Sequence, residues 1–385
     1  MLDSSLKKVV IIGPAYPYRG GISTYNDRLA QEFLAHGYEA RIETFSLQYP
    51  GFLFPGKTQF SDSEPPKGVK INRSINSIWP LNWLNVGNRI KKEKPDLVIV
   101  RYWLPFMGPS LGTIIRRIKS NGHTKVVCLA DNVIPHEKRL GDSLFTRYFL
   151  NGVNAVVAMT QKVLDDALTF RDLPTALSPH PIFDNFGAVT TKEEACKKLG
   201  LDPKLKYMLF FGLIRDYKGL DILLDAFADE QLSDPSIRLI IAGEFYSNAD
   251  KYHEQIKRLD LTDRIILKAI YIPDNEVANY FNAASLVVQP YKTATQSGVT
   301  QVAYHFNKPM IVTNVGGLKE MIPDGKVGYV VEPDSKVLAA AISRYFSENR
   351  EDEFKSNMAQ EKKKYSWPLL VKAFENLYKK LKDND

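Results

Sequence analysis

The segment from Gln289 to Asp334 reads QPYKTATQSGVTQVAYHFNKPMIVTNVGGLKEMIPDGKVGYVVEPD. It places a Ser297-Gly298 turn before an expected helix, then an apolar strand, and then a second turn at Gly316-Gly317 followed by Glu320. A small-residue turn that opens a helix leaves backbone N–H groups without intrahelical partners. Such groups near the end of a sheet bind anions, above all phosphate. The segment therefore predicts the anion-binding half of an α/β protein.

Short apolar runs alternate with amphipathic segments on the N-terminal side of this stretch. Residues 22–36 have the spacing of a helix with one apolar face. This alternation predicts two doubly wound, Rossmann-like α/β domains that face each other across a cleft, with ligands at the carboxyl ends of the strands. The expected strands are 9–13, 40–45, 96–102, 125–130, 155–160, 207–212, 238–243, 264–269, 285–290, 309–314 and 328–331.

A proline-bearing stretch, LPTALSPHPIFDNFGAV (173–189), separates the two strand series and is interpreted as the interdomain linker. The expected boundaries are residues 1–183 for the first domain and 190–362 for the second. Residues 363–385 are expected to form a helix, with a start or a kink at Trp367-Pro368, that crosses back to the first domain.

The bulk composition is that of a globular protein. Of the 385 residues, 44% are hydrophobic and 25% are charged. The net charge of +7 suits anionic substrates or an anionic membrane face, but no nucleic-acid-binding motif accompanies it. Two cysteines without metal-ligand spacing, and no apolar run long enough to cross a bilayer, favour a cytoplasmic protein, with association at the inner face of the plasma membrane as an alternative.

Two cations stand directly after the first expected strand of the second series. Arg215 and Lys218 follow Gly212 in the loop that leads into the next helix. Arginine binds a diphosphate through paired hydrogen bonds and lysine binds it as a point charge. Together they would stabilise the negative charge of a diphosphate leaving group without a metal ion. The alternative is that both are ordinary solvated loop charges.

Two glycine-bearing loops in the first half have features of phosphate sites. Gly20 and Gly21 open the helix after the first strand and would leave free N–H groups there, although a plain turn explains them equally well. The run at 51–58, GFLFPGKT, matches the P-loop pattern. A polar, proline-bearing segment follows it instead of a helix, so it is interpreted as a surface loop.

The sequence resembles family 4 of the retaining glycosyltransferases, also called glycosyl transferases group 1. The resemblance rests on FGLIRDYKGLDILLDAF (211–227), IAGEF (241–245) and NKPMIVTNVGGLKEMIPDGKVGYVVEPD (307–334). Further similar segments are GGISTYNDRLAQEFLAHGYEARI (20–42) and DNVIPHEKR (131–139). Taken in this order, the segments span nearly the whole chain.

The resemblance implies the GT-B fold and a metal-independent transfer of a hexose, with retention of configuration, from a nucleotide-diphosphate sugar of the UDP or GDP type. The resemblance also implies that domain 1–183 binds the acceptor, a glycan or a lipid-linked molecule of polysaccharide biosynthesis, and that domain 190–362 binds the nucleotide sugar. No separate cofactor and no metal are expected. The implied catalytic residues are His136, Arg215 and Lys218, with Asp131 and Asn132 as other polar groups for the cleft. The implied donor-binding residues are Gly20, Gly21, Gly212, Arg215, Lys218, Glu244, Ser297, Gly298, Val299, Thr300 and Gln301.

The family typically carries two glutamates in the pattern E-x7-E. In this chain the corresponding positions fall near Ala294 and Val302, and neither residue is acidic. Neutral polar residues, including Gln301, stand nearby instead. This departure leaves two alternatives open: a non-catalytic nucleotide- or glycan-binding protein on the same fold, and a sugar-nucleotide epimerase. The sequence does not determine the sugar, the base, the acceptor, the linkage or the oligomeric state.

An aromatic cluster in the first half allows two interpretations. With basic residues nearby, it is either an acceptor or membrane-facing surface, or ordinary core. Its members are Trp79, Trp83, Tyr102, Trp103, Phe106 and Met107.

Overall fold

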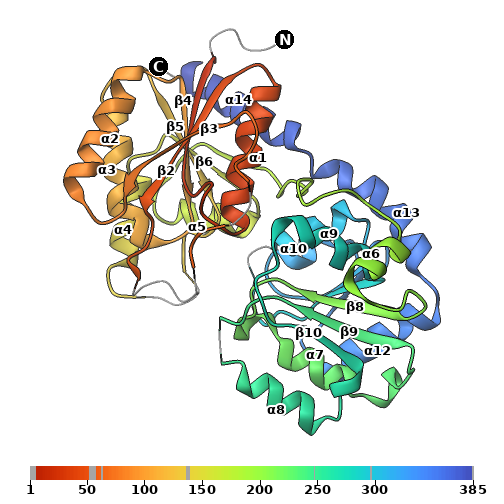
Figure 1. Cartoon of the computed structure of the whole chain (residues 1–385). Helices are drawn as coiled ribbons and strands as arrows, with labels where there is room; N and C mark the ends of the chain where they lie inside the picture. The colour runs from red at the N-terminus through yellow and green to blue at the C-terminus, as the bar shows by residue number, and fades with distance from the viewer. Residues whose placement is uncertain are drawn as a thin grey trace. The chain divides into compact units, whose positions relative to one another are not determined.

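The computed structural model describes residues 6–51, 58–61, 64–135, 139–246, 248–294 and 297–383. The chain folds into two compact units. The first comprises Met1–Pro181 and Ser366–Asp385, and the second comprises Ile182–Tyr365. The C-terminal helix therefore belongs to the first unit, although the second unit precedes it in the chain (Figure 1).

The first unit is built on a seven-stranded sheet of order β3-β2-β1-β4-β5-β6-β7 among the described residues. All of its strand pairs are parallel. Its elements are β1 (Lys8–Ile12), α1 (Gly21–Ala35), β2 (Glu39–Leu47), β3 (Lys70–Asn76), α2 (Pro80–Glu93), β4 (Leu97–Tyr102), α3 (Gly108–Lys119), β5 (Lys125–Ala130), α4 (Asp142–Leu150), β6 (Ala155–Ala158), α5 (Gln161–Leu168), β7 (Thr175–Leu177) and α14 (Trp367–Asp383).

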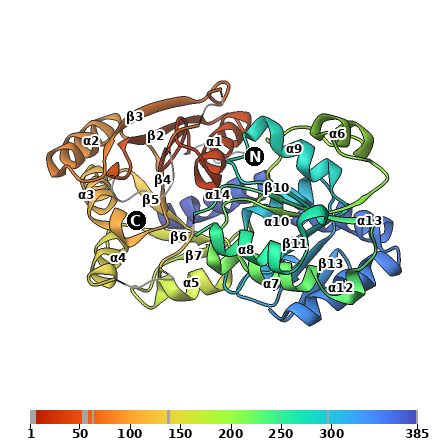
Figure 2. The ribbon, with the colours of Figure 1, turned by 60° about the horizontal axis from the view of Figure 1, so that its bottom comes forward.

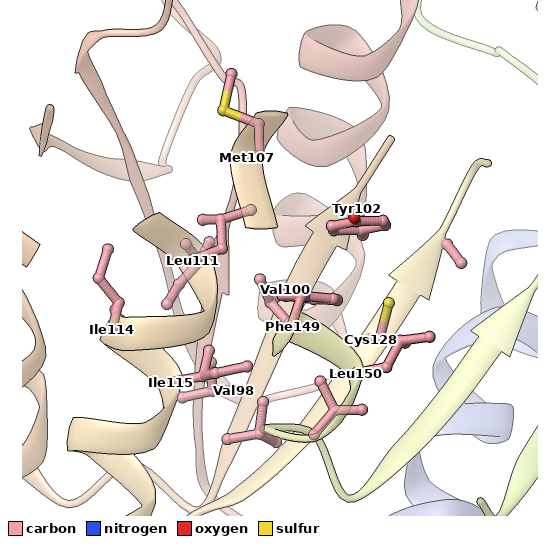
Figure 3. Packing of buried hydrophobic residues seen from close by; sticks show 14 of the residues in the cluster. Val98, Val100, Tyr102, Met107, Leu111, Ile114, Ile115, Cys128, Phe149 and Leu150 are labelled. Atoms are coloured by element: carbon pink, nitrogen blue, oxygen red, sulfur yellow. The ribbon is translucent and has the colours of Figure 1, made fainter. Parts of the chain in front are cut away.

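Helices cover both faces of this sheet. Helices α2, α3, α4 and α5 pack on one face, where alternate residues of β1, β4, β5 and β6 join their apolar side chains in one core. Figure 3 shows part of this core, in which Val98 and Val100 of β4 face Leu111 and Ile115 of α3. Helices α1 and α14 pack against each other, and α14 also contacts β5, β6 and β7.

The second unit is built on a six-stranded parallel sheet of order β10-β9-β8-β11-β12-β13 among the described residues. Its elements are α6 (Lys192–Leu199), β8 (Lys206–Phe211), α7 (Leu220–Phe227), β9 (Ile237–Ala242), α8 (Asp250–Arg258), β10 (Ile265–Lys268), α9 (Asp274–Ala283), β11 (Leu286–Gln289), α10 (Gly298–His305), β12 (Met310–Thr313), α11 (Leu318–Met321), β13 (Gly328–Val331), α12 (Ser335–Ser347) and α13 (Glu351–Glu361).

The strands of the second unit are almost wholly apolar because they are covered on both sides. One core joins alternate strand residues to the buried faces of α7, α8 and α12. Both units therefore have the doubly wound, Rossmann-like architecture expected from the alternation of strands and helices, and this expectation is confirmed.

The structure adds two strands that the sequence patterns did not predict. β3 is a sheet-edge strand with the polar sequence KINRSIN, and only Ile75 is buried. β7 lies within the stretch interpreted as linker and pairs with β6 through Thr175–Leu177. Edge strands have one partner and one open side, so they lack the apolar run by which a buried strand is recognised.

The aromatic cluster of the first unit is mostly core. Tyr102 and Met107 are buried, and Trp83, Trp103 and Phe106 pack partly buried against the same core, while Trp79 alone is largely exposed. Among the described residues no helix combines the length and the apolar character needed to cross a bilayer. The P-loop-like run lies mainly outside the described residues, because 52–57 are not among them.

Candidate functional site

The strand order of the second sheet reverses between β8 and β11. From β8 the chain proceeds outward through β9 to β10, then returns to place β11 on the other side of β8. At such a switch point the loops after the two central strands diverge and leave room for a ligand at the carboxyl edge of the sheet. The loop after β8 contains Arg215 and Lys218, and the loop after β11 leads to Ser297 and Gly298.

Glycines allow the loops at this edge to approach one another closely. Gly219 has φ 68°, and a Cβ atom there would stand 1.9 Å from the carbonyl oxygen of Pro290. Gly243 has φ 157°, and a Cβ atom there would stand 1.9 Å from the carbonyl oxygen of Gly212. Any larger side chain at either position would push the loops apart, so glycine is required at both for this close packing.

Lys218 is a buried cation at the centre of this edge. The residue is 8% exposed, and its Nζ atom lies 5.5 Å from the centre of the Tyr291 ring. Burial, with a smaller contribution from Arg215, lowers the pKa of Lys218 to about 8. Within the described part of the chain its ammonium group has no hydrogen bond and no ion pair, only the face of Tyr291.

Arg215 supplies a second positive charge beside Lys218. The residue is exposed, and its guanidinium carbon lies 5.2 Å from the centre of the Tyr246 ring. No carboxylate among the described residues forms an ion pair with it. The edge thus holds two cations to which no described residue supplies a counter-ion, an arrangement that favours binding of a multiply charged anion.

Polar side chains at the start of α10 form a closed network with the end of β11. The Ser297 hydroxyl donates a 2.6 Å hydrogen bond to Gln289 Oε1, and Gln289 Nε2 donates to Thr300 Oγ1 at 3.0 Å. Ser297 is the N-cap residue but makes no capping hydrogen bond, because its hydroxyl is engaged with Gln289. The first backbone N–H groups of α10 therefore have no side-chain cap, while Thr300 is turned inward as a support.

The positions of the two family acids are occupied by buried apolar side chains. Ala294 and Val302 are both largely inaccessible to solvent. Gln301, next to Val302, is fully buried, and neither its amide oxygen nor its amide nitrogen has a partner among the described residues. Gln301 thus provides a neutral polar side chain, as the sequence indicated. The two positions where the family has acids hold only apolar side chains.

The other predicted donor-site residues of this unit lie at the same edge. A Cβ atom on Gly212 would stand 3.1 Å from Lys218 Nζ and 3.6 Å from Val299 Cγ2, so these three residues are neighbours. Glu244 is buried two residues after the end of β9, and its backbone carbonyl accepts a hydrogen bond from the Ile214 amide. Gly316 and Gly317 precede α11, which has only four residues, so the second turn of the opening segment does not lead into a long helix.

The remaining predicted residues belong to the first unit. Gly20 is the N-cap residue of α1, with φ 110°, and Gly21 is the first residue of that helix. Asp131, at the end of β5, accepts a 2.6 Å hydrogen bond from Arg101 Nε in a buried ion pair, so it is not the available polar group that the sequence suggested. His136 lies outside the described residues.

Sequence reasoning missed the two aromatic partners of the cations, Tyr291 and Tyr246. Each follows the end of a strand, β11 or β9, where its ring meets a cation from the neighbouring loop. An aromatic residue just beyond a strand end is a weak signal, because most such residues are core. No group of three or more potential metal-ligating side chains lies together among the described residues.

The second unit matches a known family model, and known proteins are similar in sequence to this chain. Residues 191–365 match the model of Glycosyl transferases group 1. An uncharacterized glycosyltransferase of Methanocaldococcus jannaschii is 23% identical over 98% of this chain and 99% of its own length. A D-inositol 3-phosphate glycosyltransferase of Segniliparus rotundus is 30% identical, but over only 37% of this chain and 32% of that protein.

Solved structures show the same fold at lower sequence identity. Sucrose-phosphate synthase from Thermosynechococcus elongatus has a TM-score of 0.73 at 15% identity and covers 98% of this chain and 100% of its own. Anabaena HepE in complex with UDP has a TM-score of 0.71 at 15% identity, with the same coverage of both chains.

The matched residues, 191–365, include every element of the second unit, and the structural neighbours are GT-B glycosyltransferases. The second unit therefore matches a Glycosyl transferases group 1 domain, and the chain has the two Rossmann-like domains of the GT-B fold.

Proposed function

We propose that the protein is a glycosyltransferase that moves a hexose from a nucleotide-diphosphate sugar to a glycan or lipid-linked acceptor. The transfer would retain the anomeric configuration and require no metal ion. The observation that carries the proposal is a pair of cations at the switch point of the group 1 domain, Arg215 and buried Lys218, which form no ion pair with any described residue. The UDP complex of the similar Anabaena protein makes a uridine donor the first to test, with a guanosine donor second.

The proposed reaction develops negative charge on the departing diphosphate. In the proposed step the bond between the anomeric carbon and the diphosphate oxygen breaks, and the acceptor oxygen bonds to that carbon. The acceptor's proton passes to the departing diphosphate oxygen. Arg215 and Lys218 would stabilise the negative charge that grows on the diphosphate, and the uncapped N–H groups of α10 would donate to the same anion. Because Lys218 is desolvated, its attraction to the anion is stronger than at an exposed site.

Donor binding tests the proposal most directly. We expect UDP or GDP to raise the melting temperature of the wild-type protein, since a ligand that binds only the folded state stabilises it. The variants Arg215→Ala and Lys218→Met should lose most of this increase, because each removes charge-assisted hydrogen bonds that contribute roughly 10- to 100-fold in affinity.

A matched control is Lys206→Met. Lys206 lies at the amino end of β8, on the opposite edge of the same sheet, and pairs with Asp234. The Lys206→Met substitution removes the same charge as Lys218→Met but lies away from the candidate site. Nucleoside diphosphates should therefore raise the melting temperature of this variant as much as that of the wild type. If no nucleoside diphosphate raises the melting temperature, or if all three variants respond alike, the donor site is wrongly placed.

A second candidate function is nucleotide or glycan binding without turnover. The apolar side chains of Ala294 and Val302 favour it, because carboxylates at these positions contact the sugar and the ribose in the family that the chain resembles. Incubation with donor and a panel of glycan and lipid-linked acceptors discriminates the two. Transfer with retained configuration supports the enzyme, an altered nucleotide sugar supports the epimerase, and tight binding without any product supports the binding protein.

A further inference from the structure

A buried glutamine at the end of β11 holds the start of α10. Gln289 is the last residue of β11 and is 1% exposed, so its amide lies in the interior of the second unit. Its oxygen accepts a 2.6 Å hydrogen bond from the Ser297 hydroxyl, and its nitrogen donates a 3.0 Å hydrogen bond to Thr300 Oγ1. Figure 2 shows β11 and α10 next to each other in this unit. One strand side chain thereby engages two residues at the start of the neighbouring helix.

Both engaged residues stand where a helix start is ordinarily satisfied by side chains. Ser297 is the N-cap residue of α10, and Thr300 is the third residue of the helix. A serine at the N-cap normally accepts a hydrogen bond from the backbone N–H of the second or third helical residue. Ser297 makes no such bond. The first N–H groups of α10 are therefore left without a side-chain cap, although the sequence supplies a good one at the right position.

Two partners turn the Ser297 hydroxyl away from the helix. The hydroxyl donates to Gln289, and its oxygen lies 3.4 Å from the Tyr291 hydroxyl, which donates to it. All three side chains are buried, so these hydrogen bonds form away from water. The ring of Tyr291 in turn lies under Lys218, whose Nζ atom is 5.5 Å from the ring centre. The polar network at the start of α10 thus continues to the buried cation of the candidate donor site.

We infer that Gln289 is a positioning residue, which keeps the N–H groups of α10 available to an anion by withholding the Ser297 hydroxyl from them. A diphosphate oxygen then accepts the hydrogen bonds that a serine cap would otherwise take. Without Gln289 the Ser297 side chain rotates to cap α10, and an anion must displace it before binding. The effect on nucleotide affinity rests on the proposed function, whereas the effect on the cap rests only on the geometry of β11 and α10.

Gln289→Met tests the inference, because methionine has nearly the same length but makes no hydrogen bond to Ser297. We expect the dissociation constant for UDP or GDP, measured by isothermal titration calorimetry at pH 7, to rise about fivefold, which is what a serine cap contributes to a helix start. Adding Ser297→Ala to this variant should restore most of the lost affinity, because alanine has no hydroxyl to compete with the anion. Loss of packing at Gln289 alone predicts no such restoration.

Hydrogen exchange followed by mass spectrometry detects the cap without any nucleotide. The first turn of α10 should exchange about fivefold more slowly in Gln289→Met than in the wild type, and as fast as the wild type in the double variant. Ser297→Asp gives a second test with Gln289 in place. An ionised carboxylate only accepts hydrogen bonds, so it turns from Gln289 Oε1 to the helix N–H groups and should slow the same exchange.

The matched control removes a buried hydrogen bond at the opposite end of the same strand. The Tyr345 hydroxyl donates a 2.7 Å hydrogen bond to the carbonyl of Ser285, which directly precedes β11. Tyr345→Phe should unfold at a lower urea concentration than the wild type, because it leaves that carbonyl without its partner. Its nucleotide affinity and its exchange in the first turn of α10 should equal those of the wild type.

Three results would overturn the inference. They are unchanged exchange of the first turn of α10 in both Gln289→Met and Ser297→Asp, an affinity that Ser297→Ala does not restore, and equal changes in Tyr345→Phe. A wild type that binds no nucleoside diphosphate, with exchange that responds as expected, gives a different answer. The proposed function then fails, while the exchange supports the withholding of Ser297 from α10 by Gln289.

Discussion

At the scale of single residues, burial of Lys218 determines the chemistry of the candidate site. Its pKa of about 8 lies well below the ordinary value of 10.5 because the ammonium group is removed from water. The charged form binds an anion, and the neutral form does not. A nucleotide held by Lys218 would therefore bind in a pH-dependent way, within a range that is easily measured.

We predict that the affinity for a nucleoside diphosphate falls as the pH rises through 8. At pH 9 about one tenth of Lys218 is charged in the free protein, so the dissociation constant should be roughly tenfold higher than at pH 7. Isothermal titration calorimetry at several pH values measures this. Lys218→Arg should show no such dependence, because arginine stays charged, and a wild-type affinity that is constant from pH 7 to 9 would contradict the role given to Lys218.

His180 gives a second residue-scale prediction, for the stability of the first unit. Burial lowers its pKa from 6.5 to about 3, and its ring packs edge-on against Tyr25. The pKa of His180 is lower in the folded chain than in the unfolded chain. The stability that burial of the neutral ring contributes is therefore fully present above pH 6.5 and is lost as the pH falls from 6.5 toward 3. The loss is about 1.4 kcal/mol per pH unit in that window.

Urea unfolding at pH 6.5, 5.5 and 4.5 measures the contribution of His180. His180→Gln retains a donor for the Pro181 carbonyl but does not titrate, so its stability should depend less on pH over this range. His253→Gln, at an exposed position in the second unit, should behave as the wild type does. Identical pH profiles for the wild type and His180→Gln would show that His180 does not cause the loss.

At the scale of elements, the junction of α7 with β11 sets the position of both cations. Gly219 ends the short 3-10 turn Asp216–Lys218 and begins α7 in a left-handed conformation, in contact with the Pro290 carbonyl. The same turn places Lys218 Nζ 5.5 Å from the centre of the Tyr291 ring. Helix α7 and the loop after β11 are therefore packed directly against each other at the site.

We predict that Gly219→Ala destabilises the second unit by about 2 to 5 kcal/mol, from the left-handed backbone and from overlap with the Pro290 carbonyl. Gly200 is the matched control. It has nearly the same φ, 69° against 68°, but no atom within 4 Å of an added Cβ. Gly200→Ala should therefore cost only about 1 to 2 kcal/mol, from the backbone alone. Equal losses in urea unfolding would mean that the contact with Pro290 carries no energy.

At the scale of the whole molecule, the two units should respond differently to the donor. All of the candidate donor contacts except Gly20 and Gly21 belong to the second unit. We predict that a nucleoside diphosphate slows amide hydrogen exchange mainly in the loops after β8 and β11 and in the first turn of α10. Hydrogen exchange followed by mass spectrometry measures this. Slowing confined to the first unit would contradict the assignment, and Lys206→Met should reproduce the wild-type pattern.

Much of the fold was predictable because it depends on local patterns. The apolar runs of β4, β5 and β8 are buried on both faces, so their sequences identify them as central strands. β3 and β7 were not predictable in the same way, because an edge strand is recognised by its partner rather than by its own residues. The resemblance to the group 1 family was also correct for the second unit, as the match over 191–365 shows.

The sequence by itself determined the βα order, the presence of two Rossmann-like units, and the types of residue at the candidate site. Each of these depends on neighbours in the chain: periodicity, glycine turns, and charges just after strands. Only the tertiary structure decided that Lys218 is a buried cation over Tyr291, that Ser297 is engaged with Gln289, and that the start of α10 is left without a side-chain cap. Burial, a lowered pKa and an uncapped helix start are properties of atoms brought together from different elements of the chain, and no local pattern encodes them.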